Sequence, residues 1–152
     1  MSGADAPRLR EIHSTPEVAR WWGLPEPGFP SSDDPQATRL TILVEDRIAG
    51  LIQFSEEHDA DYRHARIDLF LAPELHNRGL GAEAVDALVR FLLGARGHHR
   101  VTIDPAAANV AAVRCYERAG FRRVGTLRLA ERGPSGAWHD VLLMERVVSP
   151  GP

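Results

Sequence analysis

The segment from His76 to Gly81, His-Asn-Arg-Gly-Leu-Gly, places two glycines and a basic side chain directly before a predicted amphipathic helix. Glycines at such a point let the backbone turn tightly and approach a ligand closely. The free N–H groups of the first helical turn then face that ligand, and the helix dipole adds partial positive charge. We predict a pyrophosphate-binding loop in which the amides of Gly79, Leu80 and Gly81 bind phosphate oxygens and Arg78 adds charge.

A second motif follows downstream, Asn109-x-x-Ala112-x-x-x-Tyr116-x-x-x-Gly120-Phe121. Asn109, Ala112 and Tyr116 are spaced at i, i+3 and i+7, which places them on one face of one helix. Alone, the motif would fit an N-cap asparagine and a core tyrosine, and a single Gly-x-Gly would fit a plain turn. The two motifs in this order favour a functional interpretation.

Together the motifs resemble the signatures of the GNAT superfamily of N-acetyltransferases. That family binds acetyl-CoA through a Gln/Arg-x-x-Gly-x-Gly/Ala loop, and here His76 stands where Gln or Arg is usual. The resemblance implies that Asn109 hydrogen-bonds the pantetheine arm and that Tyr116 protonates the departing thiolate. It also implies that the strand backbone near Phe70 and Leu71 polarises the thioester carbonyl.

Two aspartates are candidates for activating an amine. Asp68 lies inside an apolar strand, where a carboxylate is costly unless it is paired or useful, and Asp104 ends a later strand before a proline. Both could be structural. However, an ammonium substrate must lose a proton before it attacks a thioester, and a carboxylate can bind the cation and take that proton. We predict Asp104 as the first choice of base and Asp68 as the second.

A narrower resemblance, to the aminoglycoside 6′-N-acetyltransferases, rests on the segments 17–23, 67–72, 102–105 and 114–117. It implies that Trp21 and Trp22 pack beside the acceptor and that both aspartates lie in the acceptor cleft. It also implies an acceptor role for Glu56 in the acidic stretch before the strand of Asp68, although a solvated loop fits this stretch equally well. Asp140, on a late strand, is a further candidate contact.

Composition excludes several classes of protein. The 152 residues, 43% of them hydrophobic, can bury one sizeable core, so we expect a single domain over residues 1–152. The net charge of −3 argues against nucleic acid as a partner. No apolar run is long enough for a membrane span, the N-terminus lacks a signal-peptide design, and the single cysteine suits a reducing cytoplasm. The histidines lack metal-ligand spacing, so no metal is expected.

The fold expected from the pattern is α/β, a mixed sheet with helices on both faces. The family resemblance implies six to seven strands with a V-shaped splay, and a second N-terminal helix that the Pro-rich segment 24–37 would replace. The expected elements are a strand at 8–12, a helix at 16–23, strands at 39–45, 48–55 and 67–71, a helix from 79, a strand at 100–104, a helix at 109–119, and strands at 121–130 and 138–147.

From these observations we expect an acetyl-CoA-dependent N-acetyltransferase, a monomer or homodimer, that acts on a cationic small molecule, an aminoglycoside 6′-amine. Two alternatives stay open. The acceptor could be another amine, such as a protein N-terminus, a lysine or a small metabolite. The protein could also bind CoA or an aminoglycoside without catalysis, although a pure binder would need no acid such as Tyr116.

Overall fold

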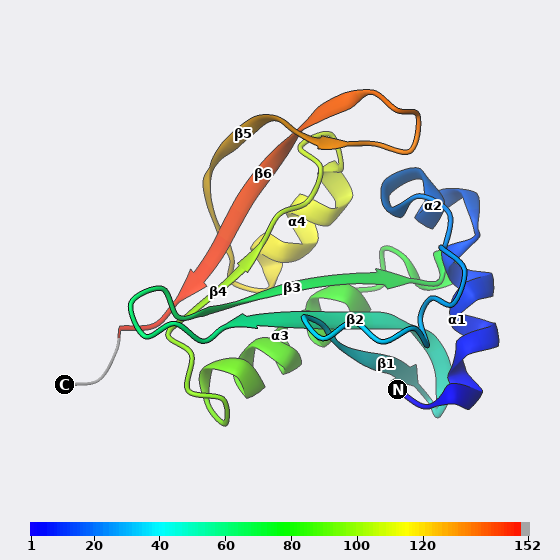
Figure 1. The fold of residues 1–152 in the computed structure, drawn as a ribbon, viewed down its shortest axis with the longest axis horizontal. Helices are drawn as coiled ribbons and strands as arrows, with labels where there is room; N and C mark the ends of the chain where they lie inside the picture. The colour runs from blue at the N-terminus through cyan, green and yellow to red at the C-terminus, as the bar shows by residue number, and fades with distance from the viewer. Residues whose placement is uncertain (150–152) are drawn as a thin grey trace.

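The computed structural model describes residues 1–149 and shows a mixed sheet of six strands in the order β1-β2-β3-β4-β6-β5 (Figure 1). The expected α/β architecture is therefore confirmed. The strands are β1 (Thr38–Val44), β2 (Arg47–Glu57), β3 (His64–Leu71), β4 (Arg100–Ile103), β5 (Arg122–Arg132) and β6 (Trp138–Val147). The helices of four or more residues are α1 (Ala6–His13), α2 (Pro16–Trp22), α3 (Leu80–Leu93) and α4 (Val110–Arg118).

The sheet opens between its two central strands. Strand β3 is antiparallel to β2 but parallel to β4, and the parallel pairing is confined to Ala65↔Val101 and Arg66↔Thr102. Beyond these two pairs the strands diverge, and Figure 1 shows β3 continuing with β2 while β4 follows β6. The V-shaped splay is therefore present. It leaves backbone groups in the second half of β3 without a partner strand on that side.

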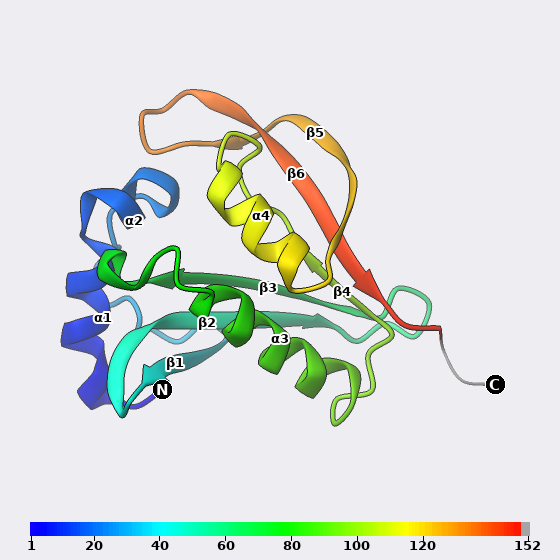
Figure 2. The ribbon, with the colours of Figure 1, turned by 180° about the vertical axis from the view of Figure 1, so that it is seen from behind.

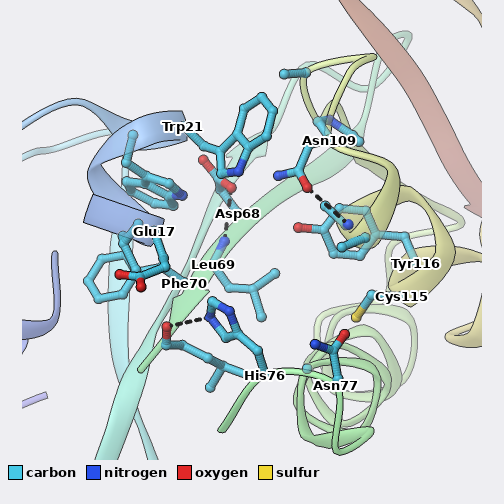
Figure 3. A pocket seen from close by; sticks show the side chains of 18 of the residues that line it. Glu17, Trp21, Asp68, Leu69, Phe70, His76, Asn77, Asn109, Cys115 and Tyr116 are labelled. Atoms are coloured by element: carbon cyan, nitrogen blue, oxygen red, sulfur yellow. Dashed lines mark hydrogen bonds between the residues drawn. The ribbon is translucent and has the colours of Figure 1, made fainter. Parts of the chain in front are cut away.

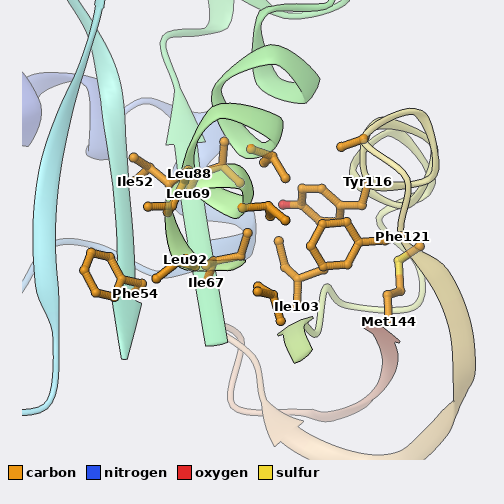
Figure 4. Packing of buried hydrophobic residues seen from close by; sticks show 14 of the residues in the cluster. Ile52, Phe54, Ile67, Leu69, Leu88, Leu92, Ile103, Tyr116, Phe121 and Met144 are labelled. Carbon is orange, nitrogen blue, oxygen red and sulfur yellow. The ribbon is translucent and has the colours of Figure 1, made fainter. Parts of the chain in front are cut away.

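Helices cover both faces of the sheet. Helices α3 and α4 lie on one face (Figure 2), where Ile67 and Leu69 of β3 join the larger core with Tyr116 and residues of α3 (Figure 4). Helices α1 and α2 cover the other face, where Phe70 packs in a smaller cluster. Because side chains alternate along a strand, Asp68 lies on the same face as Phe70. This alternation turns its carboxylate toward α2.

One expected element was wrong. Residues 8–12 form most of α1 rather than a strand, with Pro7 in the first turn and Leu9 and Ile12 fully buried. A separation of three residues puts those two side chains on one helical face, and this spacing outweighed the short apolar pattern. Two helices therefore precede β1, so the expected loss of a second N-terminal helix was also wrong. The connection 24–37 is irregular, as expected.

Candidate active site

A cavity of about 480 Å³ occupies the wedge between β3 and β4. Its walls come from α2, the second half of β3, the start of α3, α4 and one residue of β5 (Figure 3). Thirteen of the residues expected at the site line this one cavity: Trp21, Trp22, Asp68, Phe70, Leu71, His76, Arg78, Gly79, Leu80, Gly81, Asp104, Asn109 and Tyr116.

The glycine loop has the backbone expected of an anion cradle. Gly79 is the N-cap of α3 in the left-handed region, with φ +77°. The first hydrogen bond of the helix runs from the Glu83 N–H to the Gly79 carbonyl at 3.1 Å, so the amides of the turn before Glu83 have no intrahelical acceptor. A Cβ on Gly81 would lie 3.0 Å from Cys115 Sγ, so a side chain there would have to displace the Cys115 side chain of α4.

The His76 side chain contacts the protein backbone. Its Nε2 lies 2.9 Å from the carbonyl oxygen of Leu71, across the turn between β3 and α3. The ring therefore links the end of β3 to the glycine loop. This contact gives a physical reason for an imidazole at the position where the family signature has a longer side chain.

Helix α4 carries the second motif as expected. The Asn109 side-chain oxygen accepts a hydrogen bond from the Ala112 N–H at 3.2 Å, so that oxygen caps the helix. Tyr116 is buried with its hydroxyl directed into the cavity (Figure 3). Burial raises the pKa of Tyr116 well above its ordinary value, and the carboxylates of Asp68 and Asp104 add to the shift. The hydroxyl is therefore a proton donor at neutral pH.

The two aspartates differ in their surroundings. Burial raises the pKa of Asp68 to about 7, against a hydrogen bond from the Leu69 N–H at 2.9 Å, and the nearby Asp104 adds to the rise. Asp104 is gripped by the Arg66 guanidinium, whose Nε and Nη2 each lie 2.9 Å from a carboxylate oxygen. Burial still raises the pKa of Asp104, while Arg66 opposes that rise. Asp68 can thus exchange a proton near neutrality, and Asp104 is a paired anion.

Two expected acceptor contacts do not line the cavity. Glu56 lies near the end of β2, where its carboxylate accepts from Arg96 Nε at 3.0 Å and contacts His98 Nε2 at 2.7 Å. Its acidic neighbours suggested a binding loop, but the carboxylate ties two parts of the fold together. Asp140 accepts a hydrogen bond from the Leu129 N–H at 2.8 Å. Both carboxylates are committed to internal partners, so these two assignments are corrected.

Several cavity residues were missed. Glu17 lies one turn before Trp21 on α2, and this i, i+4 spacing was a readable signal. Glu131 projects from the β5–β6 hairpin, and Arg118 from the end of α4. Neither had a sequence signal, because each reaches the cavity only through tertiary packing. Cys115 also lines the cavity, and burial raises the pKa of its thiol, which makes it a poor nucleophile.

Comparison with known proteins agrees with this geometry. Residues 5–121 match the sequence model of the acetyltransferase (GNAT) family. This match covers most of the chain. The splayed sheet and the glycine loop before α3 are the structural features that the resemblance to this family implies. The protein therefore belongs to the GNAT family of acetyltransferases.

Its relatives are more specific. The chain is 28% identical over 158 residues to the aminoglycoside N(6′)-acetyltransferase type 1 of Klebsiella pneumoniae, with 89% of this chain and 77% of the relative covered. It is 38% identical over 82 residues to the kanamycin resistance protein of Rhizobium radiobacter, with 54% of this chain and 74% of that protein covered.

Among solved structures, aminoglycoside acetyltransferase AAC(6′)-Ib in complex with coenzyme A matches with a TM-score of 0.78 and 25% identity, covering 97% of this chain and 91% of that chain. The same enzyme with paromomycin and acetyl-CoA matches with a TM-score of 0.76 and 25% identity, covering 97% and 90%. Separately, none of the helices within residues 1–149 has the length and apolar character to span a bilayer.

Proposed function

We propose that the protein transfers the acetyl group of acetyl-CoA to a primary amine of a polycationic acceptor, an aminoglycoside 6′-amine. The observation that carries this proposal is the grouping in one cavity of an anion-binding helix start, a protonated tyrosine and two unequal aspartates. The aminoglycoside acetyltransferases among its relatives support the choice of acceptor. We expect the protein to act in the cytoplasm.

The residues present fit acetyl-CoA. The amides of Gly79, Leu80 and Gly81, with Arg78, would hold the pyrophosphate, and a Cβ at Gly81 would crowd Cys115. Asn109 would offer its side-chain amide to the pantetheine arm. When bound, acetyl-CoA supplies an acetyl group activated as a thioester. The unpaired backbone of β3 near Phe70 is suited to polarising that carbonyl.

Asp68 is the stronger candidate for the base, which reverses the order expected from the sequence. A base with a pKa near the working pH combines a useful fraction of the deprotonated form with real affinity for the proton. Asp104, held by Arg66, is better suited to binding and orienting a cation. Asp68 would take one proton from the ammonium, and the free amine would then attack the thioester carbonyl directly.

Tyr116 would supply the proton that the leaving thiolate needs. Its raised pKa keeps the hydroxyl protonated, and its position on α4 directs it into the cavity (Figure 3). The step then balances: the C–S bond of the thioester breaks and a C–N bond forms. The second proton that the attacking amine loses restores the Tyr116 hydroxyl, and free CoA thiol and an acetamide are released.

The acceptor end of the cavity is acidic and aromatic. Glu17 and Glu131 add two carboxylates to those of Asp68 and Asp104, while Trp21 provides an apolar wall. Several carboxylates around one cavity favour an acceptor with more than one ammonium group. A polyamino sugar has this property, and a peptide N-terminus does not.

The direct test measures thiol release from acetyl-CoA with kanamycin, and with an unrelated peptide amine as the competing acceptor. We expect turnover with kanamycin and a product carrying one added acetyl group by mass spectrometry. The Tyr116→Phe variant should keep its Tm while kcat falls about ten- to thousandfold. Thiol release only with the peptide would refute the aminoglycoside assignment. If none of the amines gave thiol release, a non-catalytic binding protein would be favoured.

A further inference from the structure

The β5–β6 hairpin contains an irregularity next to the cavity. The ladder pairs Leu127 with Val141 and then Glu131 with His139, so the three residues 128–130 of β5 stand opposite Asp140 alone. The middle one, Leu129, has φ +46°, a backbone region that costs a branched side chain free energy. Such a bulge persists only where its surroundings hold it.

The bulge determines where Glu131 lies. In an uninterrupted ladder continuing from the Leu127↔Val141 pair, Glu131 would stand opposite Ala137, toward the hairpin tip. The two extra residues instead place it opposite His139, two residue pairs farther from the hairpin tip. This displacement amounts to roughly 7 Å along the strand. At that register Glu131 lines the cavity, although about half of its side chain is exposed.

Asp140 holds both sides of this arrangement. Its carboxylate accepts the Leu129 N–H at 2.8 Å, in the middle of the bulge. Its main-chain carbonyl accepts the Ala107 N–H at 2.9 Å. Ala107 belongs to the loop that leads from Asp104 to α4, and a bridge between Ala106 and the residue after Asp140 fastens the same loop.

We propose that Asp140 is a positioning residue of the acceptor site, whose carboxylate holds the bulge that presents Glu131 to the cavity and whose carbonyl anchors the loop after Asp104. This inference rests on the proposed acetyltransfer to a polyamine. Asp140 does not touch the acceptor; its effect passes through Glu131. Removing its carboxylate should therefore weaken acceptor binding and leave acetyl-CoA binding unchanged.

The experiment compares Asp140→Ala with Asp140→Asn, which retains an oxygen acceptor, each with and without Glu131→Gln. With kanamycin, Asp140→Ala should raise the acceptor KM about three- to tenfold, while the acetyl-CoA KM and kcat change little. Asp140→Asn should stay near wild type. In the Glu131→Gln background Asp140→Ala should have no further effect, because neighbouring residues acting through one contact are not additive.

A matched control removes another side-chain bond of the same hairpin. Ser135 Oγ accepts the Ala137 N–H at 3.4 Å at the tip, away from the bulge, so Ser135→Ala should leave both KM values unchanged. An unchanged kanamycin KM in Asp140→Ala would overturn the inference. An equal Asp140→Ala effect with and without Glu131→Gln would overturn it too, since a merely structural role predicts additivity.

Amide hydrogen exchange tests the same idea without any acceptor. Exchange at the Leu129 N–H should accelerate in Asp140→Ala and stay slow in Asp140→Asn. Equal exchange in wild type and Asp140→Ala would refute the claim that the carboxylate holds the bulge. A wild type that leaves kanamycin unacetylated would instead overturn the proposed function, and this exchange result would still decide the geometric claim.

Discussion

At the scale of single residues, the site depends on two aspartates that differ in environment more than in position. Asp68 is desolvated, with its pKa raised to about 7, whereas Asp104 is paired with Arg66. The charged groups that act on Asp68 are Asp104, Arg66 and Glu131. When the surroundings give two neighbouring carboxyl groups different pKa values, one commonly accepts the proton while the other stays charged and binds the substrate.

Replacement of Asp68 tests the assignment of the base. Asp68→Asn should lower kcat about 100-fold or more and abolish the acid limb of the pH profile, which in wild type should fall as the pH drops below about 7. The pH–rate profile of kcat/KM measures both. A retained acid limb in an otherwise active variant would return the role of base to Asp104.

The same variant should be more stable than wild type in mildly alkaline buffer. A carboxyl group whose pKa is higher in the folded state than in the unfolded state binds more protons when the protein is folded. The stability of the protein therefore falls as the pH rises from the unfolded pKa of Asp68 to about 7. Asp68→Asn should therefore have the higher Tm at pH 8, with the gap closing toward pH 4. Thermal unfolding at both pH values checks this sign, and a lower Tm at pH 8 would contradict it.

Arg66 should set where the acid limb lies. Its guanidinium lowers the pKa values of both Asp104 and Asp68, so Arg66→Gln should move the acid limb to higher pH and raise the acceptor KM. Arg66→Lys keeps the positive charge and should move the limb less. Because the Arg66 side chain is 58% exposed, high salt should shrink the difference between the variants. Overlapping profiles for all three proteins at low salt would exclude this coupling.

At the scale of elements, the start of α3 depends on its packing against α4. The first turn of α3, whose free amides face the cavity, packs against α4 where Gly81 lies close to Cys115. Helix α4 therefore supports the cofactor end of the cavity as well as carrying Tyr116. A substitution in either helix at this contact should change acetyl-CoA affinity before it changes acceptor affinity.

Gly81→Val should weaken acetyl-CoA binding about tenfold or more by displacing the first turn of α3. Truncating the opposing side chain in Gly81→Val/Cys115→Ala should recover part of the loss. Gly125→Val is a matched control, because a Cβ on Gly125 meets no atom within 4 Å. Isothermal titration with acetyl-CoA measures all three, and full affinity in a folded Gly81→Val protein would remove the phosphate-loop assignment.

At the scale of the whole molecule, Glu56 joins the end of β2 to the connection between α3 and β4. Arg96 hydrogen-bonds its carboxylate and lowers the pKa of Glu56 to about 2, with His98 adding to the shift. The His98 side chain is fully buried, so losing its partner would leave a buried ring nitrogen unpaired. This cluster lies outside the cavity, and it stabilises the sheet that the site is built on.

Glu56→Gln should therefore lower stability at pH 7 by about 1–3 kcal/mol and leave the kanamycin KM unchanged. A carboxyl group with a lowered folded pKa stabilises above its unfolded pKa and loses that contribution as pH falls toward about 2. The difference from wild type should thus shrink below about pH 4.5 in urea unfolding. A raised kanamycin KM without loss of stability would restore the acceptor role that the sequence suggested.

The local sequence by itself determined the cofactor-binding end of the site and the face of the sheet on which Asp68 lies. Gly79 and Gly81 before an amphipathic helix, and Asn109 with Tyr116 on one helical face, predict a cofactor end that depends on backbone conformation and helical spacing within a few residues. The strand register of Asp68 follows from the same local alternation. These features could be read because each is complete within one element and its cap.

Only the tertiary structure decided the rest. Glu131 reaches the cavity through a bulge in β5 that Asp140 of β6 holds by a hydrogen bond. Glu56 is kept out of the cavity by hydrogen bonds to partners about 40 residues away along the chain. The proposed exchange of roles between Asp68 and Asp104 rests on the burial of Asp68 and on the hydrogen bonds from Arg66 of β3 to Asp104. Desolvation and long-range pairing depend on which residues surround a group in the folded protein, so residue type and spacing alone do not predict them.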